Sequence, residues 1–494
     1  MRGGRAGRAI ATGALLATLA TPGVGRAQDR PPDVVVIVTD DQRADTLWAM
    51  PVVQARLVGR GVRLDEGFVV NPICCPSRAS ILTGTYSHTT GVYRQSPPFG
   101  RFEWFRDAST LATWLDAAGY TTGLVGKYLD GYQHAALTGY VPPGWDRWVA
   151  FVHAAYHDYK LTVDGAIRAF GTAPEDHSTR VLAAEATAFV RAAEGPLFLY
   201  FAPAAPHGPA TPLAEDMDAF SDLPPWRPPS FDEVDVSDKP QWVRALPRLS
   251  ASQRSAIDTM RQNQYRSLLA LDRAVGEILT ALRETGRLHD TLIVYTSDNG
   301  IAWGEHRWAK KEAPYEEVIR VPIVGRWDAG GLAAASSSDE LALNIDMAPT
   351  IVEATGIRAP RMEGRSLLPV LRGQVPADWR RDFLIEHLSG SNPVPTYCAV
   401  RSDRWLYVRY TDGEEELYDV RADPYELENL ARDPSASGTV RSMAGRLDAL
   451  CDPRPPGYLD DGLDRRILFA VGALAALVGL AAVRTRRAVT KASG

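Results

Sequence analysis

Short, unbroken runs of apolar residues recur along the first two thirds of the chain, and each ends in a polar or charged cluster. The strongest runs are rich in β-branched and aromatic residues and lie at 34–38, 196–201 and 291–296, with weaker ones at 121–125 and 321–324. Such runs are typical of strands buried on both faces of a sheet. Segments with helical spacing separate them, at 111–118, 178–191 and 251–285. This alternation predicts an α/β domain with helices flanking the sheet.

The pattern changes after residue 368. Short stretches of alternating polarity, bounded by turn residues, lie at 383–387, 397–401, 405–410 and 416–418, and a helical pattern follows at about 435–450. Alternation with close turn signals is typical of antiparallel strands. We therefore expect a small C-terminal antiparallel sheet with one helix. The segment 213–247, rich in proline and acidic residues, predicts a long surface excursion over a site, with a role in substrate preference.

Both ends of the chain carry apolar runs flanked by basic residues. Residues 1–27 have the arginines, apolar core and small-residue end of a secretory signal peptide. Residues 467–483 form a run that, as a helix, is about 25 Å long, the lower limit for a membrane span. Basic residues in 484–494 favour a cytoplasmic tail. We expect an exported, surface-anchored protein, with 453–466 as the linker; a helix docked on the domain is the alternative for the tail.

Charge limits the classes of partner. The two ends hold ten of the 54 basic residues and no acidic one, so the remaining body has 44 basic against 60 acidic residues, a balance of −16. A surface of this sign argues against nucleic acid and against a long basic groove for polyanions. An anionic substrate therefore needs a local positive pocket.

Polar side chains follow two of the buried strands. Asp40 and Asp41 come after the first strand, and Asp298 and Asn299 after the strand at 291–296. Ligands of open α/β sheets bind at the carboxyl ends of the strands. Paired carboxylates repel unless a cation shares them, and hard divalent ions prefer such oxygens. These residues predict a calcium or magnesium site; a solvated or helix-capping aspartate is the plainer alternative for the first pair.

The stretch from 71 to 85, NPICCPSRASILTGT, places Cys74 and Cys75 before Pro76 and Arg78, with a helix opening at about 79–82. A reactive group at a helix start is favoured, because free N–H groups and the helix dipole stabilise an anion. The spacing C-x-P-S-R, followed by Leu-Thr-Gly, resembles the signature of the type I sulfatases, in the alkaline phosphatase superfamily. In that family the first cysteine, here Cys74, is oxidised to formylglycine by a formylglycine-generating enzyme.

The resemblance extends through about 32–450 and assigns roles to further residues. It implies that Cys74 also contributes to the metal site with the acidic residues, and that Arg78 stabilises the nucleophile. It further implies that two lysines bind the sulfate: Lys127, in a G-K context, and Lys311, three residues before a Pro-Tyr pair. Lys310 is the competitor of Lys311 for this role. His207, between prolines and a glycine, is expected to assist departure of the alcohol, with His306 as a second candidate.

One position departs from the common pattern and points to a branch. Many arylsulfatase relatives have histidine two residues after the lysine, whereas this chain has Leu129 in the sequence GKYL. This resembles the branch of N-acetylglucosamine-6-sulfatases and extracellular sulfatases. The resemblance implies an alkaline-phosphatase-like mixed sheet flanked by helices over 32–375, a C-terminal subdomain over 376–452, and hydrolysis of a sulfated sugar or aryl sulfate.

Three questions stay open from the sequence. A phosphatase or phosphonate monoester hydrolase shares this fold, and a surface glycan-binding pseudoenzyme with unconverted Cys74 is a non-catalytic alternative. If Cys74 is converted, Cys398 and Cys451 remain as a plausible disulfide pair in an exported protein, and Cys75 as a buried thiol.

Overall fold

The computed structural model describes residue 1, residues 3–4 and residues 30–458. The expected signal peptide (1–27) lies almost wholly outside the described residues, and the expected membrane span (467–483) and tail (484–494) lie wholly outside them. Within the described part, no helix is both long and apolar enough to cross a bilayer.

A ten-stranded mixed sheet forms the centre of the fold. Its strands lie in the order β11 (Ser336–Ser338), β2 (Val62–Leu64), β10 (Ile323–Arg326), β9 (Thr291–Ser297), β1 (Asp33–Thr39), β8 (Leu197–Ala202), β4 (Thr121–Gly126), β5 (Arg147–Phe151), β6 (Tyr159–Val163) and β7 (Ala166–Phe170). The five strands from β9 to β5 run parallel. β10, β6 and β7 each pair antiparallel with a neighbour. A separate two-stranded pair joins β3 (Gly67–Phe68) to β12 (Ala342–Leu343).

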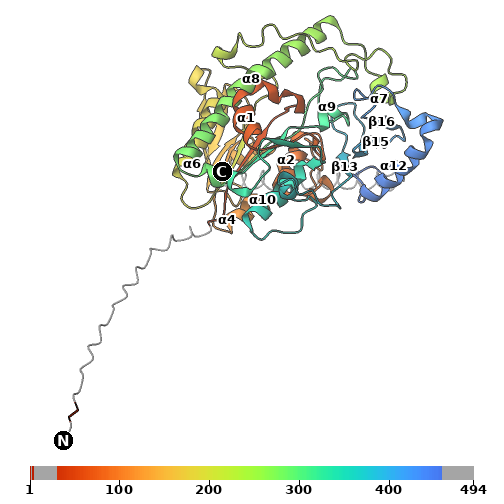
Figure 1. The fold of residues 1–494 in the computed structure, drawn as a ribbon. Coiled ribbons are helices and arrows are strands. Elements are labelled where there is room, and N and C mark those ends of the chain that lie inside the picture. The colour runs from red at the N-terminus through yellow and green to blue at the C-terminus, as the bar shows by residue number, and fades with distance from the viewer. Residues whose placement is uncertain (2, 5–29, 459–494) are drawn as a thin grey trace, which may run out of the picture. The chain divides into compact units, whose positions relative to one another are not determined.

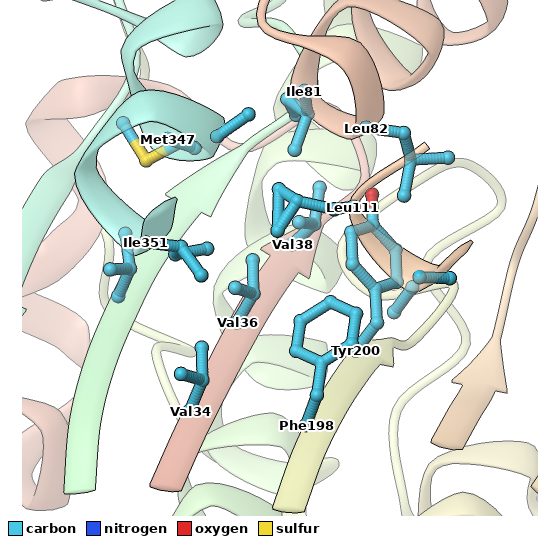
Figure 2. Close-up of a cluster of buried hydrophobic side chains, with 14 of the residues drawn as sticks. Val34, Val36, Val38, Ile81, Leu82, Leu111, Phe198, Tyr200, Met347 and Ile351 are labelled. Atoms are coloured by element: carbon cyan, nitrogen blue, oxygen red, sulfur yellow. The ribbon is translucent and has the colours of Figure 1, made fainter. Parts of the chain in front are cut away.

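Helices cover both faces of the sheet (Figure 1). One face packs on α2 (Cys74–Thr83), α4 (Leu111–Asp116) and α10 (Met347–Thr355), and the other on α1 (Pro51–Arg56), α6 (Ser178–Ala192) and α8 (Ala251–Glu284). β1 is buried along its whole length because its side chains alternate between these layers. Val34, Val36 and Val38 point toward the α2 side, as Figure 2 shows. The expected α/β architecture is confirmed.

Two local predictions differ from the structure. The helix expected from about residue 79 begins at Cys74 itself. Pro76 fits within its first turn, since the first N–H groups of a helix have no partner inside it. The strands β5, β6 and β7 were not predicted, because β5 and β6 are five-residue strands whose apolar runs are short or broken by a charged residue, and β7 is largely exposed. They extend the sheet beyond the region that hydrophobic pattern alone reveals.

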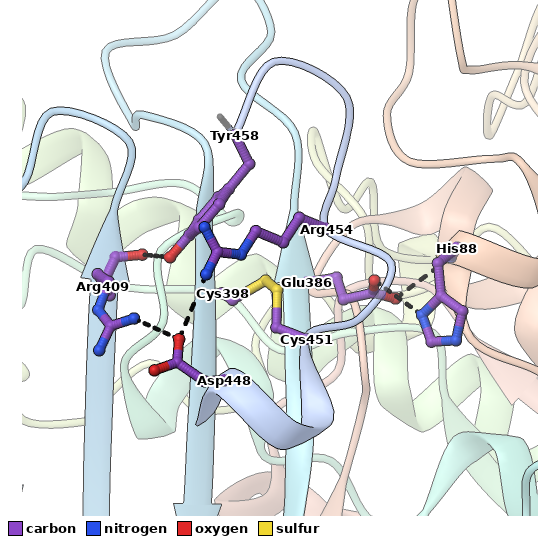
Figure 3. Close-up of a disulfide and its surroundings, with 8 residues drawn as sticks. All are labelled: His88, Glu386, Cys398, Arg409, Asp448, Cys451, Arg454 and Tyr458. Carbon is purple, nitrogen blue, oxygen red and sulfur yellow. Dashed lines mark hydrogen bonds and ion pairs between the residues drawn. A yellow bond between two sulfur atoms is a disulfide. The ribbon is translucent and has the colours of Figure 1, made fainter. Parts of the chain in front are cut away.

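The C-terminal part forms a four-stranded antiparallel sheet, as expected. It consists of β13 (Asp382–His387), β14 (Tyr397–Ser402), β15 (Trp405–Tyr410) and β16 (Glu415–Asp419), covered by α12 (Ser437–Leu450). A disulfide joins Cys398 on β14 to Cys451 at the end of α12, which confirms the expected pair (Figure 3). Cys75 is a buried free thiol.

A partly buried ion pair links this subdomain to the segment that follows α2. His88, on α3 (Ser87–Thr90), bonds Glu386 on β13 at 2.9 Å (Figure 3) and Glu363 at 3.0 Å. Burial opposes charging of the imidazole, but the two glutamates raise the pKa of His88 from 6.5 to about 10.

This pair predicts a pH-dependent stability. Because the folded-state pKa of His88 lies above its unfolded value, the stabilisation is complete below about pH 6.5 and is lost as the pH rises toward 10. We expect the free energy of unfolding to fall by about 2 kcal/mol across that window, less than the pKa shift alone implies because His88 and Glu363 are partly exposed and solvent screens their interaction. Urea unfolding at pH 6.5 and 9.5 measures this. His88→Gln should flatten the dependence and the exposed control His134→Gln should not; equal slopes in all three proteins would contradict the assignment.

Candidate active site

The acidic residues predicted to bind a metal meet at one edge of the sheet. Thr39 on β1 and Ser297 on β9 are register partners, so Asp40 and Asp298, which follow them, lie side by side. The Asp298 carboxylate accepts a bond from the Asp41 N–H at 3.1 Å. Asp41 has a φ of 66°, a left-handed conformation that turns the chain sharply at the strand end. Parallel strands deliver these groups together because their carboxyl ends share one edge.

Cys74 joins the same cluster from the first turn of α2. Its side chain is buried, and ligand atoms of Asp40, Asp41, Cys74 and Asp298 all lie within 4.8 Å of one another. The thiol lies 3.7 Å from Asp40 Oδ1 and 2.6 Å from Lys311 Nζ. The helix start thus presents the cysteine directly to the acidic edge of the sheet.

The donor set fits a hard divalent cation. Three buried carboxylates converge, and Asn299 adds an amide whose Oδ1 is enclosed without a hydrogen-bond partner among the described residues. The Asn299 Nδ2 donates to Asp41 Oδ1 at 2.6 Å, which fixes the amide in place. An enclosed amide oxygen beside carboxylates is the type of ligand that calcium and magnesium prefer.

Three cationic side chains surround the acidic cluster. Arg78, on α2, donates to Asp298 at 2.8 Å and to the Lys127 carbonyl at 3.1 Å. Lys127 pairs with Asp40 at 2.7 Å and Lys311 with Asp41 at 2.6 Å. Lys127 follows β4 directly at Gly126, where an added Cβ would lie 1.9 Å from the Ala202 carbonyl, so only glycine permits this approach. A local positive ring therefore exists within an acidic protein.

The electrostatics of the cluster are dominated by burial and by these pairs. Burial alone would raise the pKa of Asp40, yet Lys127, followed by His207, holds it far below its usual range. For Asp298 burial outweighs Arg78, and the pKa is raised. Burial also raises the pKa of the Cys74 thiol well above its ordinary value, against the pull of Lys127 and Lys311. An unmodified Cys74 is therefore a poor thiolate nucleophile.

His207 lies at the mouth of the site. Its Nε2 is 3.7 Å from Asp41 Oδ2, and its side chain is 43% exposed. The Nδ1 bonds the Gly208 carbonyl at 2.7 Å, which assigns the N–H to Nδ1 in the neutral ring. His207 is thus held with Nε2 free to exchange a proton with a bound molecule.

A cavity of about 470 Å³ opens from Asp40, Lys127 and His207. Its lining includes no residue of the segment 213–247, whose first half packs against α8 and whose Val236, Trp242 and Val243 pack in the cluster that includes the C-terminal sheet. A role of this segment in substrate preference stays a prediction. The loop from Phe151 to His157 lines the cavity. His153 and His157, which lie on this loop, were not predicted as site residues, because the strands that carry the loop were not predicted.

His306 does not join the cluster, in contrast to the expectation. Its ring is fully buried, bonds Glu233 at 2.7 Å through Nδ1, and lies 4.1 Å from the ring of Tyr315. His306 itself has a backbone φ of 50°, and this turn of the chain directs its side chain away from the acidic cluster. Of the two adjacent lysines, Lys311 reaches Cys74, whereas Lys310 is exposed and lies over Trp308.

The mixed sheet and the acidic edge that meets a nucleophile at a helix start define an alkaline-phosphatase-like hydrolase. Comparisons with known proteins specify the family. The family described as Sulfatase matches residues 32–357, and the one described as N-sulphoglucosamine sulphohydrolase, C-terminal, matches residues 304–452.

Two relatives and one solved structure illustrate the similarity. The chain is 30% identical to human N-acetylglucosamine-6-sulfatase over 93% of this chain and 92% of the relative. It is 32% identical to the Drosophila melanogaster extracellular sulfatase SULF-1 homolog over 73% of this chain, and spans only 33% of that protein's length. The solved structure of BT4656 in complex with its substrate D-glucosamine-2-N,6-O-disulfate matches with a TM-score of 0.76 at 23% identity, covering 88% of this chain and 99% of that one. The chain belongs to the sulfatase family, whose members hydrolyse sulfate esters.

Proposed function

We propose that this sulfatase removes sulfate from a small sulfated sugar of the N-acetylglucosamine-6-sulfate type, through a formylglycine made from Cys74 by a formylglycine-generating enzyme. The observation that carries the proposal is the position of Cys74, whose thiol lies within 4.8 Å of three carboxylates and 2.6 Å from Lys311. An ordinary buried cysteine has no need of such neighbours.

The chain's own residues divide the work by position. When present, hydrated formylglycine supplies one hydroxyl to attack sulfur and a second to release the sulfate, and calcium or magnesium, held by Asp40, Asp41, Asp298 and Asn299 with an oxygen at position 74, supplies charge neutralisation. Arg78 lies fully buried against Asp298 and keeps that carboxylate oriented. Lys127 and Lys311, each already beside a carboxylate, carry the positive charge that sulfate oxygens require.

Departure of the alcohol needs a proton, and His207 is placed to give it. The residue faces the cavity, and its Nδ1 contact with the Gly208 carbonyl orients Nε2 toward Asp41 and the bound ester. Leu129 occupies the place where many relatives have a histidine, and it lines the same cavity. We therefore assign the role of general acid to His207, the histidine of this cavity that lies beside Asp41.

The cavity supports a sugar-sized substrate. A volume of about 470 Å³ accommodates a monosaccharide or disaccharide but no long chain. The name of the human relative, N-acetylglucosamine-6-sulfatase, and the substrate named for the solved structure favour an amino sugar sulfated at O6. We also propose export, which the disulfide Cys398–Cys451 supports because such bonds persist in oxidising compartments, and anchoring through 467–483, which rests on the hydrophobic run in the sequence.

Three measurements test the proposal. Mass spectrometry of the peptide containing Cys74, from protein produced with a formylglycine-generating enzyme, should find formylglycine. Rates with nitrophenyl sulfate should exceed those with nitrophenyl phosphate, and N-acetylglucosamine-6-sulfate should release sulfate. Unmodified cysteine in active protein, or a preference for the phosphate ester, would contradict the proposal.

A further inference from the structure

A second cluster of metal-ligating atoms lies apart from the Cys74 site. The Nε2 of His306, a carboxylate oxygen of Glu317 on α9 (Glu316–Ile319) and one of Glu426 lie within 4.8 Å of one another. His306 and Glu426 are fully buried. All three residues have an enclosed atom without a hydrogen-bond partner in the part of the chain that the structure describes, namely His306 Nε2, Glu317 Oε2 and Glu426 Oε1. Three enclosed polar atoms facing one another call for a ligand.

The surroundings hold these groups in place. The Nδ1 of His306 bonds the Glu233 carboxylate at 2.7 Å, so the proton lies on Nδ1 and the Nε2 lone pair faces the cluster. A carboxylate behind a histidine in this way is the usual support of a metal-binding imidazole. The other oxygen of Glu426 accepts the Glu316 N–H at 3.0 Å, and Lys239 donates to the Glu426 carbonyl at 2.7 Å.

The charges favour a cation over an empty cluster. His306 offers the enclosed Nε2, which has no hydrogen-bond partner among the described residues, while its Nδ1 is bonded to Glu233. Lys239 lies 3.6 Å from Glu233 and forms an ion pair with that carboxylate, whereas in the part of the chain that the structure describes Glu317 and Glu426 form no ion pair within 4.0 Å. Two enclosed carboxylates without a cation would be costly.

We propose that His306, Glu317 and Glu426 form a second divalent-metal site, of the zinc type, distinct from the cation site at Cys74. One imidazole and two carboxylates are the ligands that zinc accepts, with water as the fourth. Donor atoms about 2.1 Å from a shared ion are at most about 4.2 Å apart. Small side-chain rotations would therefore bring the three donor atoms close enough to share one ion.

The position of the site suggests its role. His306 and Glu317 belong to the segment that follows β9, whereas Glu426 follows β16 of the C-terminal sheet. A metal there would join the two sheets, and it would act on stability. Glu317 also lines a cavity of about 450 Å³ with Arg43 and Tyr425, which offers an entry path from the surface.

Zinc binding to the EDTA-treated full chain tests the proposal. The Asp298→Asn background weakens the site at Cys74, so calorimetry with zinc chloride should there find one equivalent, and the metal should raise the melting temperature by about 3 °C at a hundredfold excess over Kd. Adding Glu426→Gln or Glu317→Gln should remove both effects. The control Glu428→Gln, two residues from Glu426 and exposed, should retain them.

The outcomes are distinct, and they do not depend on turnover of a sulfate ester. X-ray absorption at the zinc edge of the Asp298→Asn protein should show one imidazole among oxygen ligands. This measurement leaves His306, Glu317 and Glu426 unchanged, so it does not depend on whether variants of these residues fold. Absence of zinc binding in that background would overturn the proposal. Glu→Gln variants that bind zinc as well as the parent would also overturn the proposal. So would Glu→Gln variants that are more stable than the parent, since higher stability would indicate that the two carboxyl groups share a proton and not a metal ion.

Discussion

Replacing Cys74 by alanine should lower kcat/KM for nitrophenyl sulfate by at least about 10⁴-fold, because the variant lacks the nucleophile that the rest of the site surrounds. The Cys74 side chain contacts both Lys311 and the acidic cluster, so no other side chain in the described part of the chain can take its place as nucleophile. Stopped-flow or extended end-point assays measure the loss.

Cys74→Ser separates the proposed chemistry from simple nucleophilic attack. A serine offers one hydroxyl, so it can accept the sulfuryl group but cannot release it as the two hydroxyls of a hydrated aldehyde can. We expect at most one turnover and a serine sulfate detectable by intact mass. The matched control is Cys75→Ala, an adjacent buried thiol whose Sγ lies 3.9 Å from the Asp130 carbonyl, which should keep kcat/KM within about threefold. Steady turnover by Cys74→Ser would contradict the scheme.

Asp298→Asn should reduce activity by about 10³-fold and lower the calcium content of the purified protein. The carboxylate is fully buried, accepts the Arg78 Nε–H at 2.8 Å and receives the Asp41 N–H at 3.1 Å. Asparagine keeps its shape but removes the charge that both the cation and Arg78 require, and unpairing a buried arginine is strongly unfavourable. Elemental analysis and kcat/KM with added calcium measure the two effects.

A buried pair at the other end of the same sheet supplies the control. Asp33, at the start of β1, pairs with Arg287 at 3.1 Å and is buried like Asp298. Asp33→Asn should cost comparable stability yet leave calcium content and kcat unchanged, since it lies at the edge opposite Asp40. Equal losses of activity in the two variants would indicate that Asp298 acts through folding alone.

The site explains how an acidic protein attracts an anion. The body of the chain carries a balance of −16, yet three cations converge within hydrogen-bonding distance of the carboxylates at the strand ends. Each cationic side chain forms a short ion pair with a carboxylate, and this pair keeps the side chain from turning toward solvent. Binding of sulfate then depends on this local ring and not on long-range attraction.

Hydrophobic pattern was enough to predict the centre of the fold. The runs that became β1, β8 and β9 are apolar on both faces, and only a strand between two helical layers tolerates that. Polar residues directly after such strands therefore lie at the carboxyl edge of the sheet. The convergence of Asp40 and Asp298 therefore followed from local sequence and parallel pairing together.

Tertiary structure alone decided which neighbours of the motifs enter the site. The family resemblance favoured Lys311 over Lys310, two adjacent residues of the same type, and the path of the loop brings Lys311 to Cys74. His306 was a reasonable candidate beside an active-site motif, but packing against Tyr315 and Glu233 places it in another cluster. Residue type and spacing along the chain thus determined the strands and the chemistry at their ends. Side-chain direction in loops depends on contacts with distant segments, which no local pattern encodes.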